Sequence, residues 1–325
     1  MSTPGLSYWY EQIFGPELFP EDAVVLMQQQ PDFAQACVAC ARGNLALRST
    51  NPALARAFRD SARSFYAMFA VILDARGPVT LASLQALSAQ FGFASRGRAA
   101  AMMMYLRMIG YLEPSPQQTD RRSRSYAASP KLIAIHDQFI ANEIAAAATI
   151  EPELRPVLAR LHEPAVRNAY LRQLGIGLMR LLRTAPQPTS LFADRDAGLA
   201  ILYQLALGGE DGDTYPARGP VRLSLSACAR QHGVSRSHVS RLLRDAVAAD
   251  LLREAGDGAW ILQERLRVAL SRLHAYSFVG HAALAYYAVK LASEGAAPAG
   301  GRPSAVGGIV PDGLPPAMAE TPRFT

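Results

Sequence analysis

Residues 230–246 read RQHGVSRSHVSRLLRDA, and this stretch decides the fold that we expect for the C-terminal half of the chain. A turn residue, Gly233, comes shortly before Ser235, and serine is favoured at the N-cap of a helix. Placed at about 100° per residue from Ser235, the segment has one apolar side and one polar side. The apolar side, which we expect to be buried, consists of Val239, Leu242, Leu243 and Ala246. The polar side, which we expect to be exposed, consists of Ser237, Arg241 and Arg244, flanked by Arg236, His238 and Ser240.

The composition combines enough apolar residues for proper cores with a modest basic excess. The 325 residues are 50% hydrophobic, which suffices for about two ordinary domains. The net charge of +6 and the sequence pI of about 9.4 fit an anionic partner. Of the 33 basic residues, only Lys131 and Lys290 are lysine. This preponderance of arginine reflects either genomic base composition or a need for bidentate contacts with guanine and phosphate.

Cysteine usage and hydropathy indicate the compartment. Three cysteines cannot form a disulfide framework, which predicts a reducing interior. The chain shows no charged-then-apolar leader, and no apolar run reaches about 18 residues. We therefore expect a cytoplasmic protein with no membrane partner.

Short motifs recur in the same order at a near-constant offset. GPVT at 77–80 returns as GPVR at 219–222, and PELFP at 16–20 resembles PELRP at 152–156. Each GPV motif is followed by a small-residue helix pattern, a glycine and a Ser-Arg pair. These matches predict a tandem duplication. Its parts are an N-terminal repeat at 1–150 with a compact unit at about 60–145, a C-terminal repeat at 151–294 with a compact unit at about 194–275, and a disordered tail at 295–325.

Apolar periodicity predicts a mainly α-helical protein with small β strands. The strand signals lie around 79–81, 111–127, 221–223 and 251–262. Long helices are expected at 24–49, 131–148, 164–183 and 263–293. Because these helices are too apolar to stand alone, we expect them to pack together across the duplication and to join the two units.

The expected order in each repeat is helix, strand, helix, turn, helix, strand, turn, strand. This order resembles the winged helix-turn-helix of MarR-type bacterial transcription regulators. In the second repeat the resemblance rests on helices at Ser226–Gln231 and Ser235–Ala249, the turn His232–Val234, and wing strands Leu251–Glu254 and Ala259–Leu262 around Gly256-Asp257-Gly258. In the first repeat it rests on Leu81–Gln90, Phe91–Ala94, Ser95–Ile109 and a longer wing at Thr119–Leu132.

The resemblance implies that the chain binds double-stranded DNA. A recognition helix places side chains from its N-terminal turns on base edges in the major groove. Wings reach the minor groove or the backbone, where arginine is favoured. The DNA-binding residues implied in the second repeat are Ser235, Arg236, Ser237, His238, Ser240, Arg241 and Arg244. Those implied in the first are Ser95, Arg96, Arg98, Arg121, Arg122 and Arg124.

The two predicted recognition helices differ in their polar rows. In register, Ser237, Arg241 and Arg244 correspond to Gly97, Ala101 and Met104. Our hypothesis is that the second repeat reads bases through its helix, whereas the first anchors the protein through its arginine-rich wing. The alternative is that the first unit has lost DNA binding and serves as a scaffold or partner surface, with Met104 as an adaptable contact.

Other candidate sites give weaker indications of function. Cys37 and Cys40 form a C-x-x-C on one face of a predicted helix, where burial is the default and a redox or metal role the alternative. The acidic loop at 210–213 lacks the glutamate of a calcium loop and is expected to be solvated.

Aromatic residues between the helices and the units would line a ligand pocket, although core packing is their default role: Tyr8, Trp9, Tyr10, Tyr276, Phe278, Tyr286 and Tyr287. No catalytic or nucleotide-binding motif is present, so we expect neither an enzyme nor a cofactor.

The sequence thus predicts a sequence-specific, double-stranded DNA-binding transcriptional regulator that acts as an intramolecular pseudo-dimer and is associated with the nucleoid. Two alternatives stay open: a plasmid-type replication initiator, and an adaptor whose winged helices bind protein. RNA polymerase or another regulator is a further candidate partner. A small-molecule effector has no support in the sequence.

Overall fold

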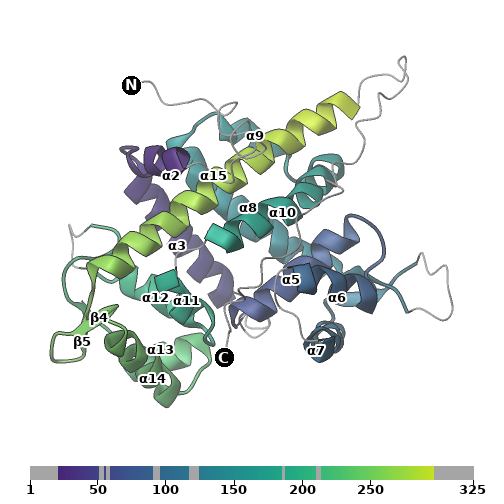
Figure 1. Cartoon of the computed structure of the whole chain (residues 1–325). Coiled ribbons are helices and arrows are strands. Elements are labelled where there is room, and N and C mark those ends of the chain that lie inside the picture. The colour runs from purple at the N-terminus through teal and green to yellow at the C-terminus, as the bar shows by residue number, and fades with distance from the viewer. Residues whose placement is uncertain are drawn as a thin grey trace.

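The structure is a computed structural model, and it describes residues 21–50, 55, 59–90, 96–116, 124–184, 187–209 and 214–295. These residues form thirteen helices and two small antiparallel sheets, which confirms the mainly helical class (Figure 1). Within the described ranges, no helix is both long enough and apolar enough to span a membrane.

A layer of packed helices forms the upper part of the molecule in Figure 1. Its longest member, α15, crosses this layer and contacts α2, α8, α9 and α10, while α3 packs on α8. The helices expected to pack together across the repeats therefore do so. The layer consists of α2 (Glu21–Gln28), α3 (Phe33–Thr50), α8 (Pro130–Ile150), α9 (Leu154–Arg160), α10 (Pro164–Thr184) and α15 (Glu264–Gly295).

One helix boundary was predicted wrongly. The continuous helix expected at 24–49 is divided into α2 and α3 by the turn around Pro31. Proline lacks a backbone N–H and disfavours helical geometry in the residue before it, so the helix ends and restarts there.

The first unit, residues 61–128, lies to the lower right in Figure 1. In it β1 and β2 pair antiparallel, and Val79 forms an isolated bridge to Tyr126 on the other side of β2. Asp60 caps α5 by accepting a hydrogen bond from the N–H of Arg63 at 2.7 Å. The elements are α5 (Ser61–Asp74), α6 (Leu81–Gln90), α7 (Arg96–Met108), β1 (Leu112–Pro114) and β2 (Tyr126–Ala128).

The second unit, residues 198–262, lies to the lower left and follows α11 (Gln187–Ala193). Its strands form a sheet of order β3-β5-β4, with Val221 opposite Trp260 and Leu252 opposite Leu262. The elements are α12 (Gly198–Leu207), β3 (Val221–Arg222), α13 (Leu225–His232), α14 (Arg236–Ala248), β4 (Leu252–Glu254) and β5 (Ala259–Leu262).

The two units are alike in several local backbone features. The N–H of Tyr111 donates to the carbonyl of Leu106 at 2.8 Å, and the N–H of Leu251 donates to that of Ala246 at the same distance. Gly110 and Asp250, one residue earlier in each case, both have positive φ angles, 72° and 53°. The two valines of the GPV motifs both pair with the strand that leads into the next long helix.

Two hydrophobic clusters hold the molecule together. The first cluster forms the core of the second unit and includes Leu266 and Leu270 from the start of α15. The other runs from the first unit into the helical layer and includes residues of α9 and α10 as well as the later part of α15. The long helix α15 therefore belongs to both clusters and connects the second unit to the helical layer.

Several predicted features lie outside the described residues. They are the turn at 91–94 with Ser95, the first part of the first wing at 119–123 including Arg121 and Arg122, the acidic loop at 210–213, the aromatic residues 8–10, and the predicted tail beyond Gly295.

Candidate nucleic-acid interface

Helix α14 has the capped, two-sided form that the sequence predicts. Ser235 is extended at φ −80° and ψ 152°, and its Oγ accepts a hydrogen bond from the N–H of His238 at 3.0 Å. The predicted apolar side is buried, since Val239, Leu242, Leu243 and Ala246 are at most 2% exposed. These four residues pack into the cluster of the second unit, so the opposite side of α14 must face outward.

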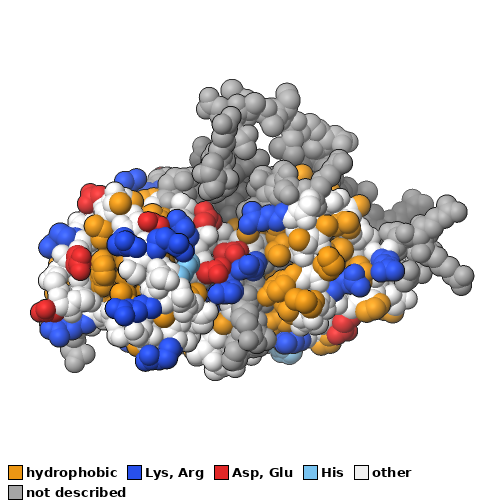
Figure 2. Space-filling view, turned by 90° about the horizontal axis from the view of Figure 1, so that it is seen from below, with side chains coloured by type: hydrophobic (Ala, Val, Ile, Leu, Met, Phe, Trp, Pro, Cys, Tyr) orange, Lys and Arg blue, Asp and Glu red, His pale blue; other side chains and the backbone are white. Residues whose placement is uncertain are grey.

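The outward side of α14 carries the predicted polar row. Ser237, Arg241 and Arg244 are exposed, as are Ser235 and Arg236 at the start of the helix, and Ser240 is half-buried. Figure 2 shows that basic side chains gather over the half of this face that holds α13 and α14. The positive end of the helix dipole lies at the same end as Ser235 and Arg236.

The turn before α14 is fixed by its glycine. Gly233 has a φ of +64°, and its N–H lies against the carbonyls of Ala229 and Arg230 at the end of α13. The next N–H, of Val234, donates to Ala229 at 3.0 Å. Glycine adopts this left-handed geometry without steric cost, which sets the angle between α13 and α14.

The two histidines beside this face are engaged by the protein. His238 is half-buried, and its Nε2 lies 2.9 Å from the backbone oxygen of Asp196. His232 is half-buried as well, and its Nε2 lies 2.9 Å from Oε1 of Gln204. Burial, with help from the charge of Arg48, lowers the pKa of His232 to about 4, so its ring is neutral at pH 7.

The corresponding side of α7 in the first unit is apolar. Met104 and Met108 are 64% and 76% exposed, and Gly97 and Ala101 complete the same stripe. Hydrophobic side chains accordingly gather over the half of the face in Figure 2 that holds α6 and α7. The opposite side of α7 is buried through Ala99, Met103 and Leu106.

Few of the cations predicted for the first unit can be placed. Arg98 and Arg124 are exposed. Arg96 begins α7, but its side chain, like Ser95, Arg121 and Arg122, lies outside the described residues. Arg107, which was not among the predicted residues, is exposed on α7 and lies 4.7 Å from the ring centre of Tyr126.

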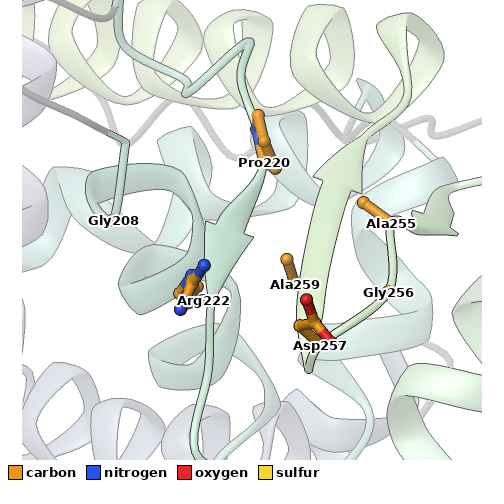
Figure 3. Close-up of a pocket in the computed structure, with 7 residues that line it drawn as sticks. All are labelled: Gly208, Pro220, Arg222, Ala255, Gly256, Asp257 and Ala259. Atoms are coloured by element: carbon orange, nitrogen blue, oxygen red, sulfur yellow. The ribbon is translucent and has the colours of Figure 1, made fainter.

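The hairpin of the second unit is short and carries mixed charge. Glu254 and Asp257 are exposed, and the three residues of the Gly256-Asp257-Gly258 turn all have positive φ angles, 82°, 49° and 71°. Beside the turn lies a hollow of about 350 Å³, and Figure 3 shows the residues that line it, with Arg222 on β3 and Asp257 in the turn before β5. Its lining is Gly208, Pro220, Arg222, Ala255, Gly256, Asp257 and Ala259.

A second hollow of about 270 Å³ lies between α5, α8 and α10. Asp74, Arg167 and Asn168 supply its polar groups, and Arg167 pairs with Asp137 at 3.5 Å. Two of the aromatic residues considered for a ligand pocket, Tyr276 and Phe278, are instead buried in the core.

Sequence patterns gave no sign of a buried polar layer between α3, α8 and α15. The carboxylate of Glu143 accepts hydrogen bonds from Ser277 Oγ at 2.7 Å, Asn44 Nδ2 at 3.0 Å and Cys40 Sγ at 3.2 Å. Glu143 is 3% exposed. A single glutamate in a helix pattern does not reveal its partners, because they lie 99 to 134 residues away along the chain.

This layer keeps the C-x-x-C thiols protonated. Cys37 and Cys40 are fully buried, as the default interpretation predicts. Burial, reinforced by the charge of Glu143, raises the pKa of both thiols well above its ordinary value. Burial alone would raise the pKa of Glu143, but His281 and the hydrogen bonds from Ser277 and Asn44 lower it below its usual range. Across the described ranges, no group of three or more His, Cys, Asp or Glu residues is arranged to hold a metal ion.

Comparison of the chain with protein-family models, with curated proteins and with solved structures found no match.

Proposed function

We propose that this chain is a sequence-specific, double-stranded DNA-binding transcriptional regulator, with α14 as its principal recognition helix. The observation that carries the proposal is the exposed row of Ser237, Arg241 and Arg244 on a capped helix whose opposite side is fully buried. Arginine side chains on an outward helix face can make bidentate contacts with guanine in the major groove.

The order of elements supports the same proposal. Residues 198–262 run helix, strand, helix, turn, helix, strand, turn, strand, which is the order of a winged helix-turn-helix. The N-terminal end of α14 is exposed, and a helix N-terminus favours nearby phosphate through its backbone N–H groups and its dipole. The β4–β5 hairpin would be the wing, and its residues Glu254 and Asp257 make it a weak backbone contact.

We further propose that residues 61–128 form a second, equivalent unit and that the chain is an intramolecular pseudo-dimer. The shared hydrogen bonds after α7 and α14 and the paired valines of the two GPV motifs support this equivalence. Both α7 and α14 lie at the lower edge of Figure 1, on one side of the helical layer. Such a protein would read two unlike half-sites about one helical turn apart, because its two faces differ.

The decisive experiment selects duplexes from a random DNA pool with the wild type and with Arg241→Ala/Arg244→Ala. The double variant should lose base preference in one half-site, at a cost of about 1–3 kcal/mol for each bidentate contact. A matched control is Arg42→Ala/Arg155→Ala, which removes two exposed arginines from α3 and α9 and changes the net charge equally. The control should keep the wild-type preference.

The other outcomes favour the alternatives. Enrichment of repeated origin sequences in the cell would favour a replication initiator. The selection could also enrich no sequence, and generic duplex could bind no better at low salt than at high salt. The row of Ser237, Arg241 and Arg244 would then bind a protein, and the adaptor interpretation would replace this proposal.

A further inference from the structure

The loop between α11 and α12, residues 194–197, joins the two units through polar contacts. The carboxylate of Asp196 lies 3.3 Å from Nη2 of Arg59 and 3.2 Å from Nη1 of Arg63, just before and within α5. In the same place the N–H of Ala197 donates to the backbone oxygen of Arg59 at 2.6 Å. The segments that precede the first helices of the two units therefore lie against each other.

The same loop also holds the recognition helix proposed above. The backbone oxygen of Asp196 lies 2.9 Å from Nε2 of His238 on α14. Its neighbour Arg195 pairs with Asp245 on α14 at 3.1 Å. Arg59 completes the connection, because its Nη2 donates to the backbone oxygen of Gly233, at the turn before α14, at 3.3 Å.

The backbone of the loop leaves it little freedom. Ala197 is 5% exposed and has a φ of 58°, a left-handed conformation that is uncommon for residues other than glycine. The next residue, Gly198, packs so closely that a Cβ atom would lie 1.9 Å from the backbone oxygen of Phe192. A strained backbone of this kind persists only where the surrounding contacts fix it.

The ion pairs of the loop act mainly on the relative orientation of the two units and add little to the stability of the fold. The side chains of Arg59, Arg63 and Asp196 are about one-third exposed, at 32%, 33% and 34%. Pairs at this exposure are partly screened by water and salt, and each adds little to the folding free energy. Two arginines on one carboxylate, together with the backbone contact of Ala197, nevertheless define one relative position of the units.

We propose that Asp196 is a positioning residue that fixes the first unit relative to α14 and thereby selects the spacing between the two parts of the DNA site. This inference rests on the proposed function. A connected pair of binding modules gains affinity for a two-part site only when the connection lets both modules bind at once. Loosening the connection should therefore change the tolerance for spacing without changing the contacts that α14 makes.

The first test uses the duplex selected by the wild type and a version with about 5 base pairs, half a helical turn, inserted between its halves. The half-turn insertion should weaken wild-type binding about tenfold or more, because only one module can then bind. Asp196→Asn should show less than about a threefold loss on the same insertion, since loosely joined modules tolerate different spans. Its affinity for a single half-site should equal that of the wild type.

The second test does not depend on DNA. Spin labels at Met108→Cys on α7 and Val247→Cys on α14 report the distance between the units, and the three natural cysteines are buried. The distance distribution should be narrow in the otherwise wild-type chain and broad with Asp196→Asn. Arg59→Gln, which removes a partner of both Asp196 and Gly233, should broaden it as well. The matched control Asp22→Asn, an exposed carboxylate on α2, should leave it narrow.

The outcomes separate this inference from the proposed function. A narrow distribution for Asp196→Asn, or an unchanged preference for spacing in a variant that still binds DNA, overturns the inference alone. Failure of the wild type to select any duplex overturns the proposed function, and the role in spacing falls with it.

Discussion

Helices α7 and α14 each follow a shorter helix and precede an antiparallel pair of strands, yet their outward sides differ completely. Where α14 presents Ser237, Arg241 and Arg244, α7 presents Gly97, Ala101 and Met104. Their inward sides are alike, because Ala99, Met103 and Leu106 are buried as Val239, Leu243 and Ala246 are. The fold therefore constrains one side of each helix and leaves the chemistry of the other open.

The position of a helix in a fold therefore does not assign its function. Exposed methionines such as Met104 and Met108 form an adaptable apolar surface, whereas exposed arginines supply directional donors and charge. Function resides in the side chains that a scaffold displays, so the two helices need separate tests. Four predictions address the comparison, beginning with the scaffold that both units share.

The largest effect is expected from Glu143→Leu in the helical layer. The change leaves the buried donors of Asn44 and Cys40 and the half-buried hydroxyl of Ser277 without their acceptor, and each unsatisfied buried group costs about 1–3 kcal/mol. The free energy of unfolding should fall by about 3 kcal/mol or more in denaturant titrations. Glu143→Gln, which keeps an acceptor oxygen, should lose much less. Equal stability of the two variants would contradict the role of the buried hydrogen bonds.

The next effect concerns the proposed division of labour. Replacing Arg121, Arg122 and Arg124 by alanine should weaken DNA binding and lower the slope of log affinity against log salt by up to about 3, at about 0.9 for each lost phosphate contact. Base preference should stay the same. An unchanged affinity and slope would show that the first wing does not anchor the protein on DNA. In that case only the second unit would contact DNA, and the first would serve as a scaffold.

A smaller effect is expected at the cap of α14. Ser235→Ala removes the acceptor of the His238 N–H and should lower stability by about 1 kcal/mol, measured by thermal unfolding. Ser235→Asp should preserve the cap, although its charge should weaken DNA binding. A loss of stability in both variants would mean that the cap is not what holds the start of the helix.

The smallest effect is expected on the apolar side of α7. Met104→Ser/Met108→Ser changes two exposed side chains and should alter stability by no more than about 0.5 kcal/mol. DNA affinity should also stay the same if α7 does not read bases. A marked loss of affinity would show that this side contacts DNA and would remove the difference between the two helices.

Much of the second unit could be predicted from the sequence because its signals are local. The helix predicted at Ser235–Ala249 is observed as α14, Arg236–Ala248, with Ser235 as its cap, and the strand at Ala259–Leu262 is found as predicted. Caps, glycine turns and apolar periodicity act over a few residues, so they can be identified in a single sequence. The break at Pro31, by contrast, was missed because the apolar pattern continues on both sides of it.

The helical class, the two sides of α14 and the burial of Cys37 and Cys40 could be predicted, since each follows from the spacing of apolar residues along one element. Three contacts could not be predicted in this way: His238 lies against the loop of Asp196, Arg59 reaches the turn at Gly233, and Glu143 accepts hydrogen bonds from two other helices. These contacts join residues that are 42 to 174 positions apart. They depend on how the helices pack, because periodicity reports which side of an element is buried but not which side chains it meets there.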